Sequence, residues 1–264
     1  MLAVSAPQLW AQQREVIVAA GISAPAIYGA NEMPALPMSP VLPRMSPELA
    51  LQRYLQRAQR QLTDLGYYSD RTVVEADLPS TKQRGRYELL RTFTAPKSLV
   101  FSAKQFIGDN FVKSNVIVRL LEAEVDSVKK AQGPQLAIND ANYKFKLKAS
   151  ERLNGNAVYA FEVKPRRKRS GLFKGRVYVD AYTGSIRRAE GVMVKSPSFF
   201  IKKIEFVQDY ADFDGFSLPV HIHSDTRARI IGRALVDVYH SDYQPRPVTD
   251  ASSQEFFLSP TGSN

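Results

Sequence analysis

Most of the chain alternates between apolar and polar positions, which is the period of strands in a half-buried sheet. Val, Ile, Phe and Tyr are frequent in these segments, as is typical of strands. The expected strands are Arg84 to Ala95, Ser98 to Lys104, Tyr143 to Arg152, Ala157 to Pro165, Leu172 to Asp180, Ser185 to Val194, Phe200 to Tyr210, Phe216 to Asp225 and Ile230 to Tyr239. Asn154-Gly155, Thr183-Gly184 and Asp214-Gly215 stand between consecutive strands, where glycine supplies the positive φ of a tight turn. The order predicts an antiparallel meander from Tyr143 to Tyr239.

Two segments instead repeat their apolar positions every three or four residues, as amphipathic helices do. The first begins at Ser46-Pro47, a serine N-cap followed by proline at the first helical position, and runs to Leu65. The second is Asn115 to Lys130, with its lysines at the C-terminal end. Helices ahead of a meander predict an α+β fold: a curved antiparallel sheet, or half-open β-barrel, with helices covering its concave face.

The first 45 residues have a different character. MLAVSAPQLWAQQ has a short apolar run and resembles a signal-peptidase site after Ala11, although it lacks the basic n-region of such signals. From Gly21 to Met45, five prolines exclude a regular helix or a central strand. We therefore expect a signal-like segment and Pro-rich leader at 1–45, a folded domain at 46–244 and a flexible tail at 245–264.

Charge is unevenly distributed along the 264 residues. The net charge is +10, and Pro165 to Lys203 contains 11 Lys or Arg against only Asp180 and Glu190. Arg166, Arg167, Lys168 and Arg169 lie between two expected strands. We expect this basic loop either to be a solvated turn or to dock on an anionic membrane or an acidic protein partner. Nucleic acid is not expected, because aromatic residues do not recur among the basic ones.

Catalytic signals are weak throughout. The sequence has no cysteine, no H-E-x-x-H, no G-x-x-x-x-G-K-[ST] and no G-x-G-x-x-G. His221 and His223 project from one face of a strand and would suit a metal, but alternating polar residues are also the ordinary outer face of a half-exposed strand. We expect no enzyme, no catalytic residue, no metal and no cofactor.

The apolar faces of the strands are broad. Val177 and Val179 point to one side, Phe216, Leu218, Val220 and Ile222 share a face, and so do Ala234, Val236 and Val238. If the helices cover this face completely, its apolar side chains form an ordinary hydrophobic core without a cavity. If they leave a gap, it has a hydrophobic cavity.

Four segments carry a resemblance to a known family: YAFEVKPRRKR, FKGRVYVDAYTGSIRRAEG, SPSFFIKKIEFVQDY and GFSLPVHIHSDTRARIIGRALVDVYHSDY. In this order they resemble the bacterial outer-membrane lipoprotein-sorting proteins of the LolA/LolB-like superfamily. The resemblance covers Tyr143 to Tyr243 and implies a half-open barrel lidded by helices, with an apolar cavity for acyl chains in the periplasm. Without an N-terminal cysteine, the chain is not expected to be the acylated, membrane-anchored type.

These considerations predict a soluble periplasmic carrier or sensor of lipoprotein acyl chains or other lipids, acting as a monomer. The alternative is an envelope-stress or protein-interaction module with a sealed core. The residues expected to line or close the cavity are Leu121, Val125, Val177, Val179, Phe216, Leu218, Val220, Val236 and Val238.

Overall fold

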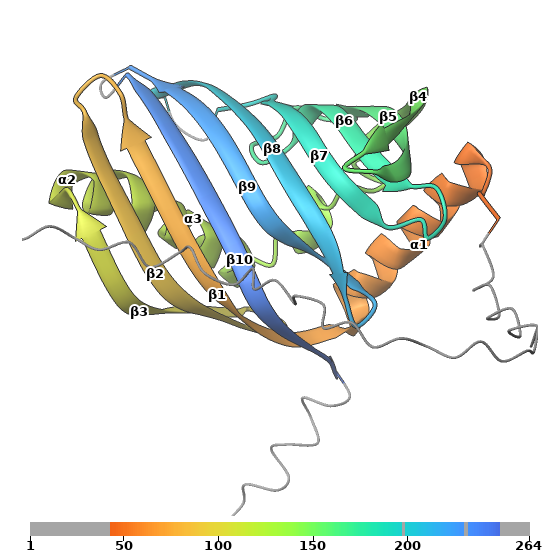
Figure 1. Cartoon of the computed structure of the whole chain (residues 1–264), viewed down its shortest axis with the longest axis horizontal. Helices are drawn as coiled ribbons and strands as arrows, with labels where there is room; N and C mark the ends of the chain where they lie inside the picture. The colour runs from red at the N-terminus through yellow and green to blue at the C-terminus, as the bar shows by residue number, and fades with distance from the viewer. Residues whose placement is uncertain (1–42, 197–198, 230–231, 249–264) are drawn as a thin grey trace, which may run out of the picture. The chain divides into compact units, whose positions relative to one another are not determined.

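The structure is a computed structural model that describes residues 43–196, 199–229 and 232–248. Within these ranges ten strands form one antiparallel sheet in the order β3-β2-β1-β10-β9-β8-β7-β6-β5-β4 (Figure 1). The strands are β1 (Leu65–Leu78), β2 (Gln83–Thr94), β3 (Ser98–Gly108), β4 (Tyr143–Leu153), β5 (Asn156–Pro165), β6 (Phe173–Asp180), β7 (Ile186–Met193), β8 (Ile201–Phe213), β9 (Phe216–Ala228) and β10 (Arg233–Pro247).

From β4 to β10 each strand pairs with the next, as the meander predicted. The turns also match, because Asn154-Gly155 and Asp214-Gly215 both have positive φ at their two residues. Strand β10 then pairs with β1 rather than ending the sheet, for example through Val74 opposite Val238. This pairing joins the N-terminal strands β1, β2 and β3 to the meander in a single curved, open sheet.

The first helix, α1 (Pro47–Asp64), begins where predicted, with the Ser46 hydroxyl accepting a hydrogen bond from the Leu49 amide at 3.3 Å. The second helical region starts earlier than expected. It comprises α2 (Asn110–Val112), a π-helical turn η1 (Lys113–Ile117) and α3 (Val118–Lys129). A short helix, α4 (Gly133–Leu136), follows it. In the part of the chain that the structure describes, no helix is both long and apolar enough to cross a bilayer.

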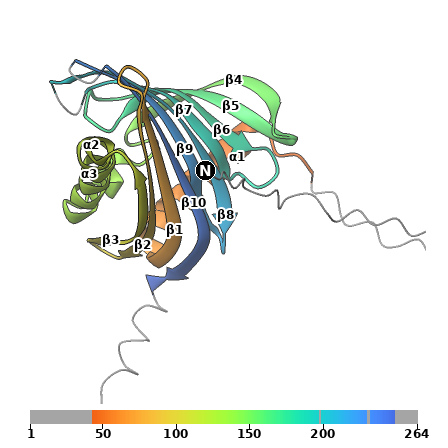
Figure 2. The ribbon, with the colours of Figure 1, turned by 60° about the vertical axis from the view of Figure 1, so that its left-hand side comes forward.

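The helices pack against the concave face of the sheet at its two ends. Figure 2 shows α2 and α3 against the inner side of β1, β2 and β3. The apolar cluster beneath them, here called the α3 core, comprises Val74, Ala76, Leu78, Leu89, Val112, Ile117, Leu121, Ala234, Val236 and Val238. The predicted fold, a curved antiparallel sheet with helices on its concave face, is confirmed.

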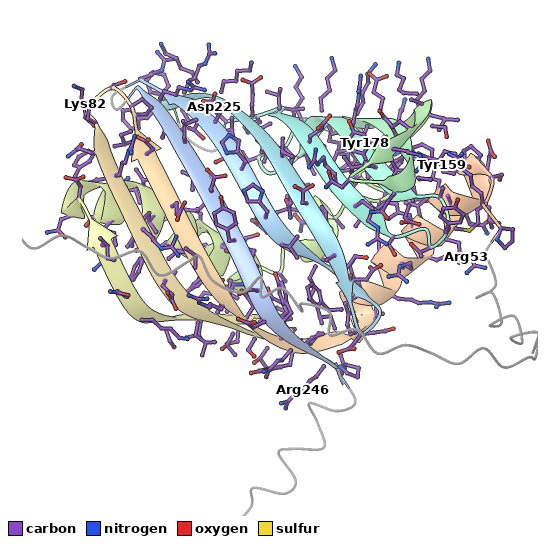
Figure 3. The ribbon with its side chains drawn as sticks, in the orientation of Figure 1. Arg53, Lys82, Tyr159, Tyr178, Asp225 and Arg246 are labelled. Carbon is purple, nitrogen blue, oxygen red and sulfur yellow. The ribbon has the colours of Figure 1, made fainter. Side chains whose placement is uncertain are left out.

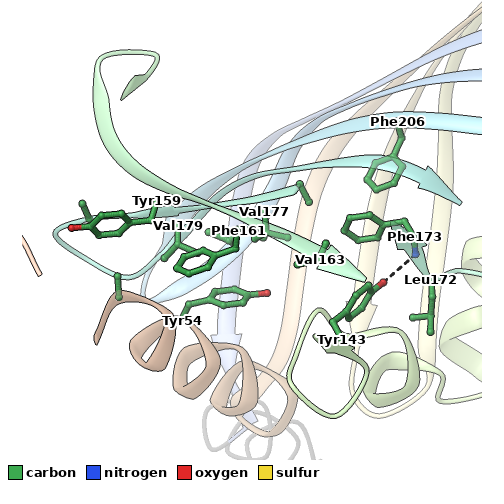
Figure 4. Packing of buried hydrophobic residues seen from close by; sticks show 14 residues of the cluster. Tyr54, Tyr143, Tyr159, Phe161, Val163, Leu172, Phe173, Val177, Val179 and Phe206 are labelled. Atoms are coloured by element: carbon green, nitrogen blue, oxygen red, sulfur yellow. Dashed lines mark hydrogen bonds between the residues drawn. The ribbon is translucent and has the colours of Figure 1, made fainter. Parts of the chain in front are cut away.

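The second cluster, here called the α1 core, lies at the other end (Figure 4). Its members are Ala50, Tyr54, Tyr143, Tyr159, Phe161, Val163, Leu172, Phe173, Val177, Val179, Ala181, Ile186, Ala189 and Phe206. Two phenols have polar partners inside it: the Tyr54 hydroxyl donates to the Ile138 carbonyl at 2.6 Å, and the Tyr143 hydroxyl accepts from the Phe173 amide at 3.2 Å. These bonds satisfy the polar ends of buried rings, so the cluster packs without an orphaned hydroxyl.

The predicted signal-like segment, most of the leader and most of the tail lie outside the described residues. At its C-terminal end β10 continues to Pro247, opposite Leu65. The strand therefore extends three residues beyond position 244.

Candidate functional site: a cavity between two cores

A cavity of about 570 Å³ lies on the concave face between the α1 core and the α3 core. Phe173 and Phe206 of the α1 core line one side, and Leu121, Val236 and Val238 of the α3 core line the other. The remaining apolar lining is Val74, Leu120, Leu136, Ala137, Ile138, Tyr143, Met193, Ile204, Tyr210, Pro219 and Ile222. Its size falls in the range of ~300–1,000 Å³ that is usual for small-molecule sites.

The centre of the concave face is incompletely covered. Ile204 of β8 and Ile222 of β9 point into the cavity and are only half-buried, and Leu120 of α3 is 40% exposed. By contrast, Val74 in the neighbouring α3 core is fully buried. Exposed apolar surface gathered in a concave site, rather than scattered singly, is typical of a place that another apolar molecule covers.

One wall of the cavity contains a buried charge, the guanidinium of Arg91 on β2, whose side chain is only 4% exposed. Its Nε donates to Asp70 Oδ2 at 2.7 Å, Nη1 to Glu124 Oε1 at 2.8 Å and Nη2 to the Tyr243 hydroxyl at 2.7 Å. The guanidinium also lies over the Tyr68 ring, 5.0 Å from its centroid. Burial opposes the charge, but Tyr68 and the carboxylates of Glu124 and Asp70 outweigh it and raise the pKa of Arg91.

A histidine completes this network. Asp70 Oδ1 accepts from the Thr72 hydroxyl at 2.7 Å and lies 3.0 Å from His240 Nδ1. Burial opposes ionisation of Asp70, but bonds from His240 and Thr72 and the charge of Arg91 lower its pKa below the ordinary value. Burial lowers the pKa of His240, and this effect is larger than the opposite effect of the nearby Asp70 carboxylate. Because an ionised carboxylate can only accept, Nδ1 carries the proton of the neutral imidazole.

His240 makes stability depend on pH. Its pKa is lower in the folded chain than in the unfolded chain, where it is about 6.5, so protonation favours unfolding. We expect the free energy of unfolding to fall as the pH drops below about 6.5, by at most ~1.4 kcal/mol per pH unit for one proton. The lowered pKa of Asp70 extends the loss below about pH 4.

Urea unfolding at a series of pH values between 7.5 and 5.0 measures this slope. His240→Asn keeps a donor for Asp70 but does not titrate, so it should flatten the curve in this range. Ser241→Asn, an exposed position on the same strand at which no titratable group is lost, is the control and should leave the slope unchanged. Equal slopes for the parent and His240→Asn would show that another group takes up the proton.

The structure brings together three of the nine predicted cavity residues, Leu121, Val236 and Val238. Val177 and Val179 are fully buried in the α1 core beside the cavity. The remaining four are Val125, Phe216 and Val220, which are half-buried, and Leu218, which is buried.

The face predicted to be shared by Phe216, Leu218, Val220 and Ile222 is interrupted by a β-bulge. Asp209 pairs with His221 and Tyr210 pairs with Pro219, so Val220 has no partner on β8. An extra residue reverses the alternation of the strand. As a result Pro219 and Ile222 both line the cavity.

Sequence reasoning missed the inward residues of β8 and the polar wall. Ile204, Phe206, Gln208 and Tyr210 alternate along β8 and all line the cavity, so the period of two would have found them. The polar lining residues Thr72, Arg91, Glu124 and His240 come from distant parts of the sequence and have no common motif.

His221 and His223, the two residues weighed as metal ligands, lie on the convex face, where Figure 3 shows Asp225 of the same strand. His221 Nε2 and His223 Nδ1 each lie 2.9 Å from Asp237 Oδ1, and the His221 ring stacks on Tyr239 at 4.6 Å. Among the residues described, no three or more His, Cys, Asp or Glu side chains are grouped so as to hold a metal ion.

The four basic residues predicted for docking, Arg166 to Arg169, are all exposed in the loop between β5 and β6. Arg166 Nε donates to the Asp140 carbonyl at 2.7 Å, and Arg169 Nη1 donates to Gln135 Oε1 at 2.8 Å. These bonds hold the basic loop against the segment that follows α3.

Residues 138–245 match the model of a family of unknown function, DUF5686. No match is found among curated proteins. Among solved structures, the chain is similar to a LolA superfamily protein from Nitrosomonas europaea, with 15% identity over 79% of this chain and 99% of that chain and a TM-score of 0.39.

Two further structures are similar to this chain. A putative outer-membrane lipoprotein-sorting protein domain from Vibrio parahaemolyticus is 14% identical over 75% of this chain and 92% of that chain, with a TM-score of 0.39. MucB of Pseudomonas aeruginosa, solved with MucA, is 11% identical over 75% of this chain and 99% of that chain, with a TM-score of 0.25. A LolA superfamily protein is thus among the structures that are similar to this chain.

Proposed function

We propose that this protein binds the acyl chains of lipids or lipoproteins in the cavity between the α1 core and the α3 core. The observation that supports this most strongly is the half-buried apolar centre of the concave face, represented by Ile204 and Ile222. A sealed-core interaction module, the alternative function, would bury these side chains.

The apolar lining accounts for affinity without a reactive group. Burying one methylene contributes about 0.8 kcal/mol, so ten would contribute roughly 8 kcal/mol. That corresponds to micromolar binding before the entropic cost of association is subtracted. The cavity therefore supports holding an acyl chain reversibly, as a carrier or a sensor must.

The polar wall favours binding over catalysis. All three guanidinium nitrogens of Arg91 bond to protein groups, and Asp70 bonds to Arg91, Thr72 and His240. These groups are bonded to one another and not held ready for a substrate, so they fix the shape of the cavity wall. The signal-like N-terminal sequence supports export, and we place the carrier in the periplasm.

We expect the purified protein to release acyl lipids when it is extracted with organic solvent and analysed by mass spectrometry. After delipidation, it should bind a fluorescent fatty acid in a saturable way because the chain fits the apolar cavity. The matched control is the same fluorophore without its acyl chain, which should not bind. Protein that yields no lipid and takes up no fatty acid would rule out the proposed function.

A further inference from the structure

A second pocket, here called the arginine pocket, lies beside the cavity and has a volume of about 500 Å³. Arg166, Arg167 and Arg169 line it. The other lining residues are Pro134, Gln135, Ala141, Asn142 and Leu172, so no acidic residue is among them. Three arginines and no acidic residue among the lining residues make the pocket a positive site.

The arginine pocket and the cavity are separated by a wall about one residue thick. Gln135 lines the pocket, and the next residue, Leu136, lines the cavity. Likewise Asn142 lines the pocket and Tyr143 lines the cavity. Where the basic loop enters β6, Leu172 lines the pocket, whereas its neighbours Gly171 and Phe173 line the cavity. A molecule that fills the cavity therefore has the arginine pocket immediately next to it.

The wall is closed by contact between Leu136 and Gly171. A Cβ at Gly171, where φ is +86°, would lie 2.7 Å from Leu136 Cδ2. Glycine thus allows the leucine side chain to pack directly on the loop backbone. The contact involves two short segments, α4 and the basic loop, rather than two strands of the sheet.

The arginines are held at the pocket but keep donors for a ligand. Arg166 and Arg169 each commit one nitrogen to the protein, through the Asp140 carbonyl and Gln135 Oε1. A guanidinium carries five N–H donors, so most remain available. Three such groups offer more donors and more positive charge than a single carboxylate can use. A phosphate has more acceptor oxygens and up to two negative charges, so it matches the pocket better.

We infer that the arginine pocket binds the phosphate group of an anionic amphiphile whose chain occupies the cavity, and that the Leu136 side chain turns away from Gly171 to let the molecule pass between the two. The inference rests on the proposed function, since the cavity must hold the chain. The inference also assigns different roles to the four basic residues of the loop, which the sequence predicted to act together. Arg166, Arg167 and Arg169 contact the phosphate, while Lys168 does not line the pocket and has no part in recognition.

The test compares n-dodecyl phosphate, n-dodecanol and inorganic phosphate as competitors of the fluorescent fatty acid, in phosphate-free buffer. We expect dodecyl phosphate to bind about tenfold or more tightly than dodecanol, because charge-assisted hydrogen bonds add to the same chain contacts. Rising salt should narrow the difference. Binding of inorganic phosphate alone, measured by calorimetry, should be far weaker than binding of dodecyl phosphate.

The variant Arg167→Gln, and the double variant with Arg169→Gln, should bring dodecyl phosphate to the affinity of dodecanol without weakening dodecanol. Lys168→Gln removes one charge from the same loop and should preserve the full difference. Equal affinities for dodecyl phosphate and dodecanol in the parent protein would overturn the inference and leave the proposed function standing. Inorganic phosphate binding as tightly as dodecyl phosphate would also overturn it, as would an equal effect of Lys168→Gln. Failure of every ligand to displace the fatty acid would instead refute the proposed function.

Discussion

Replacing Arg91 with leucine should lower the free energy of unfolding by about 3–5 kcal/mol. The guanidinium is almost fully buried and bonds to strand β1 through Asp70, to α3 through Glu124 and to β10 through Tyr243. Its removal leaves the carboxylate of Asp70, which is fully buried, without its cationic partner. An unpaired buried charge is much more costly than the loss of one exposed ion pair. Urea denaturation followed by circular dichroism measures the change.

The control is Arg71→Leu, one residue from Asp70 on the same strand. Arg71 forms a two-nitrogen ion pair with Glu88, but its side chain is 44% exposed, so its loss should have a much smaller effect. Adding Asp70→Asn to Arg91→Leu should restore part of the lost stability, because the double variant no longer buries an unpaired charge. If Arg91→Leu and Arg71→Leu are equally mild, the buried network does not stabilise the fold as argued.

The second large effect is expected for Ile222→Trp, which should block binding of the fatty acid. Ile222 is half-buried on the inward face of β9, and the larger ring would enter the cavity. Displacing even two methylenes of the ligand costs ~1.6 kcal/mol, or more than tenfold in affinity. The dissociation constant of the fluorescent fatty acid, measured by titration, reports the effect.

His223→Trp is the matched control, since the neighbouring residue points to the convex face and contacts Asp237. It adds a ring of the same kind without entering the cavity, so binding should be unchanged. Both variants should retain cooperative unfolding. Undiminished binding by a folded Ile222→Trp protein would place the acyl chain elsewhere.

Much of the fold could be predicted because its signals are local. The serine and proline at residues 46 and 47 determine where α1 begins, and the asparagine-glycine and aspartate-glycine pairs determine two hairpin turns. These effects act within a few residues of the chain. The meander follows from them, since short turns join neighbouring strands.

Strand β1 was missed for a physical reason that also concerns the site. Two of its inward positions hold Asp70 and Thr72 instead of apolar residues, so alternation is not apparent before Val74. Their burial is tolerated because Arg91 and His240 bond to them. Those partners lie 21 and 170 residues from Asp70, which is beyond any local pattern.

The cavity was predicted as one of two possibilities, and its lining only in part. Alternation identifies which residues share a face, but not how far a helix covers that face. The bulge at Val220 shows a second limit, because register depends on the partner strand β8 rather than on β9 alone.

The position of β10 makes the sheet depend on a strand that comes late in the described chain. Strand β10 follows the other nine strands of the described residues, yet it lies inside the sheet, with β1 on one side and β9 on the other. It also supplies Val236, Val238, His240 and Tyr243, which form part of the cavity and of the Arg91 network. A chain that ends before Arg233 has no strand to join β1 to β9, so it contains two separate sheets and half a binding site. The two halves of the sheet can therefore join only after β10 has been synthesised, and the contacts between β1 and β10 are among the most distant in the described chain.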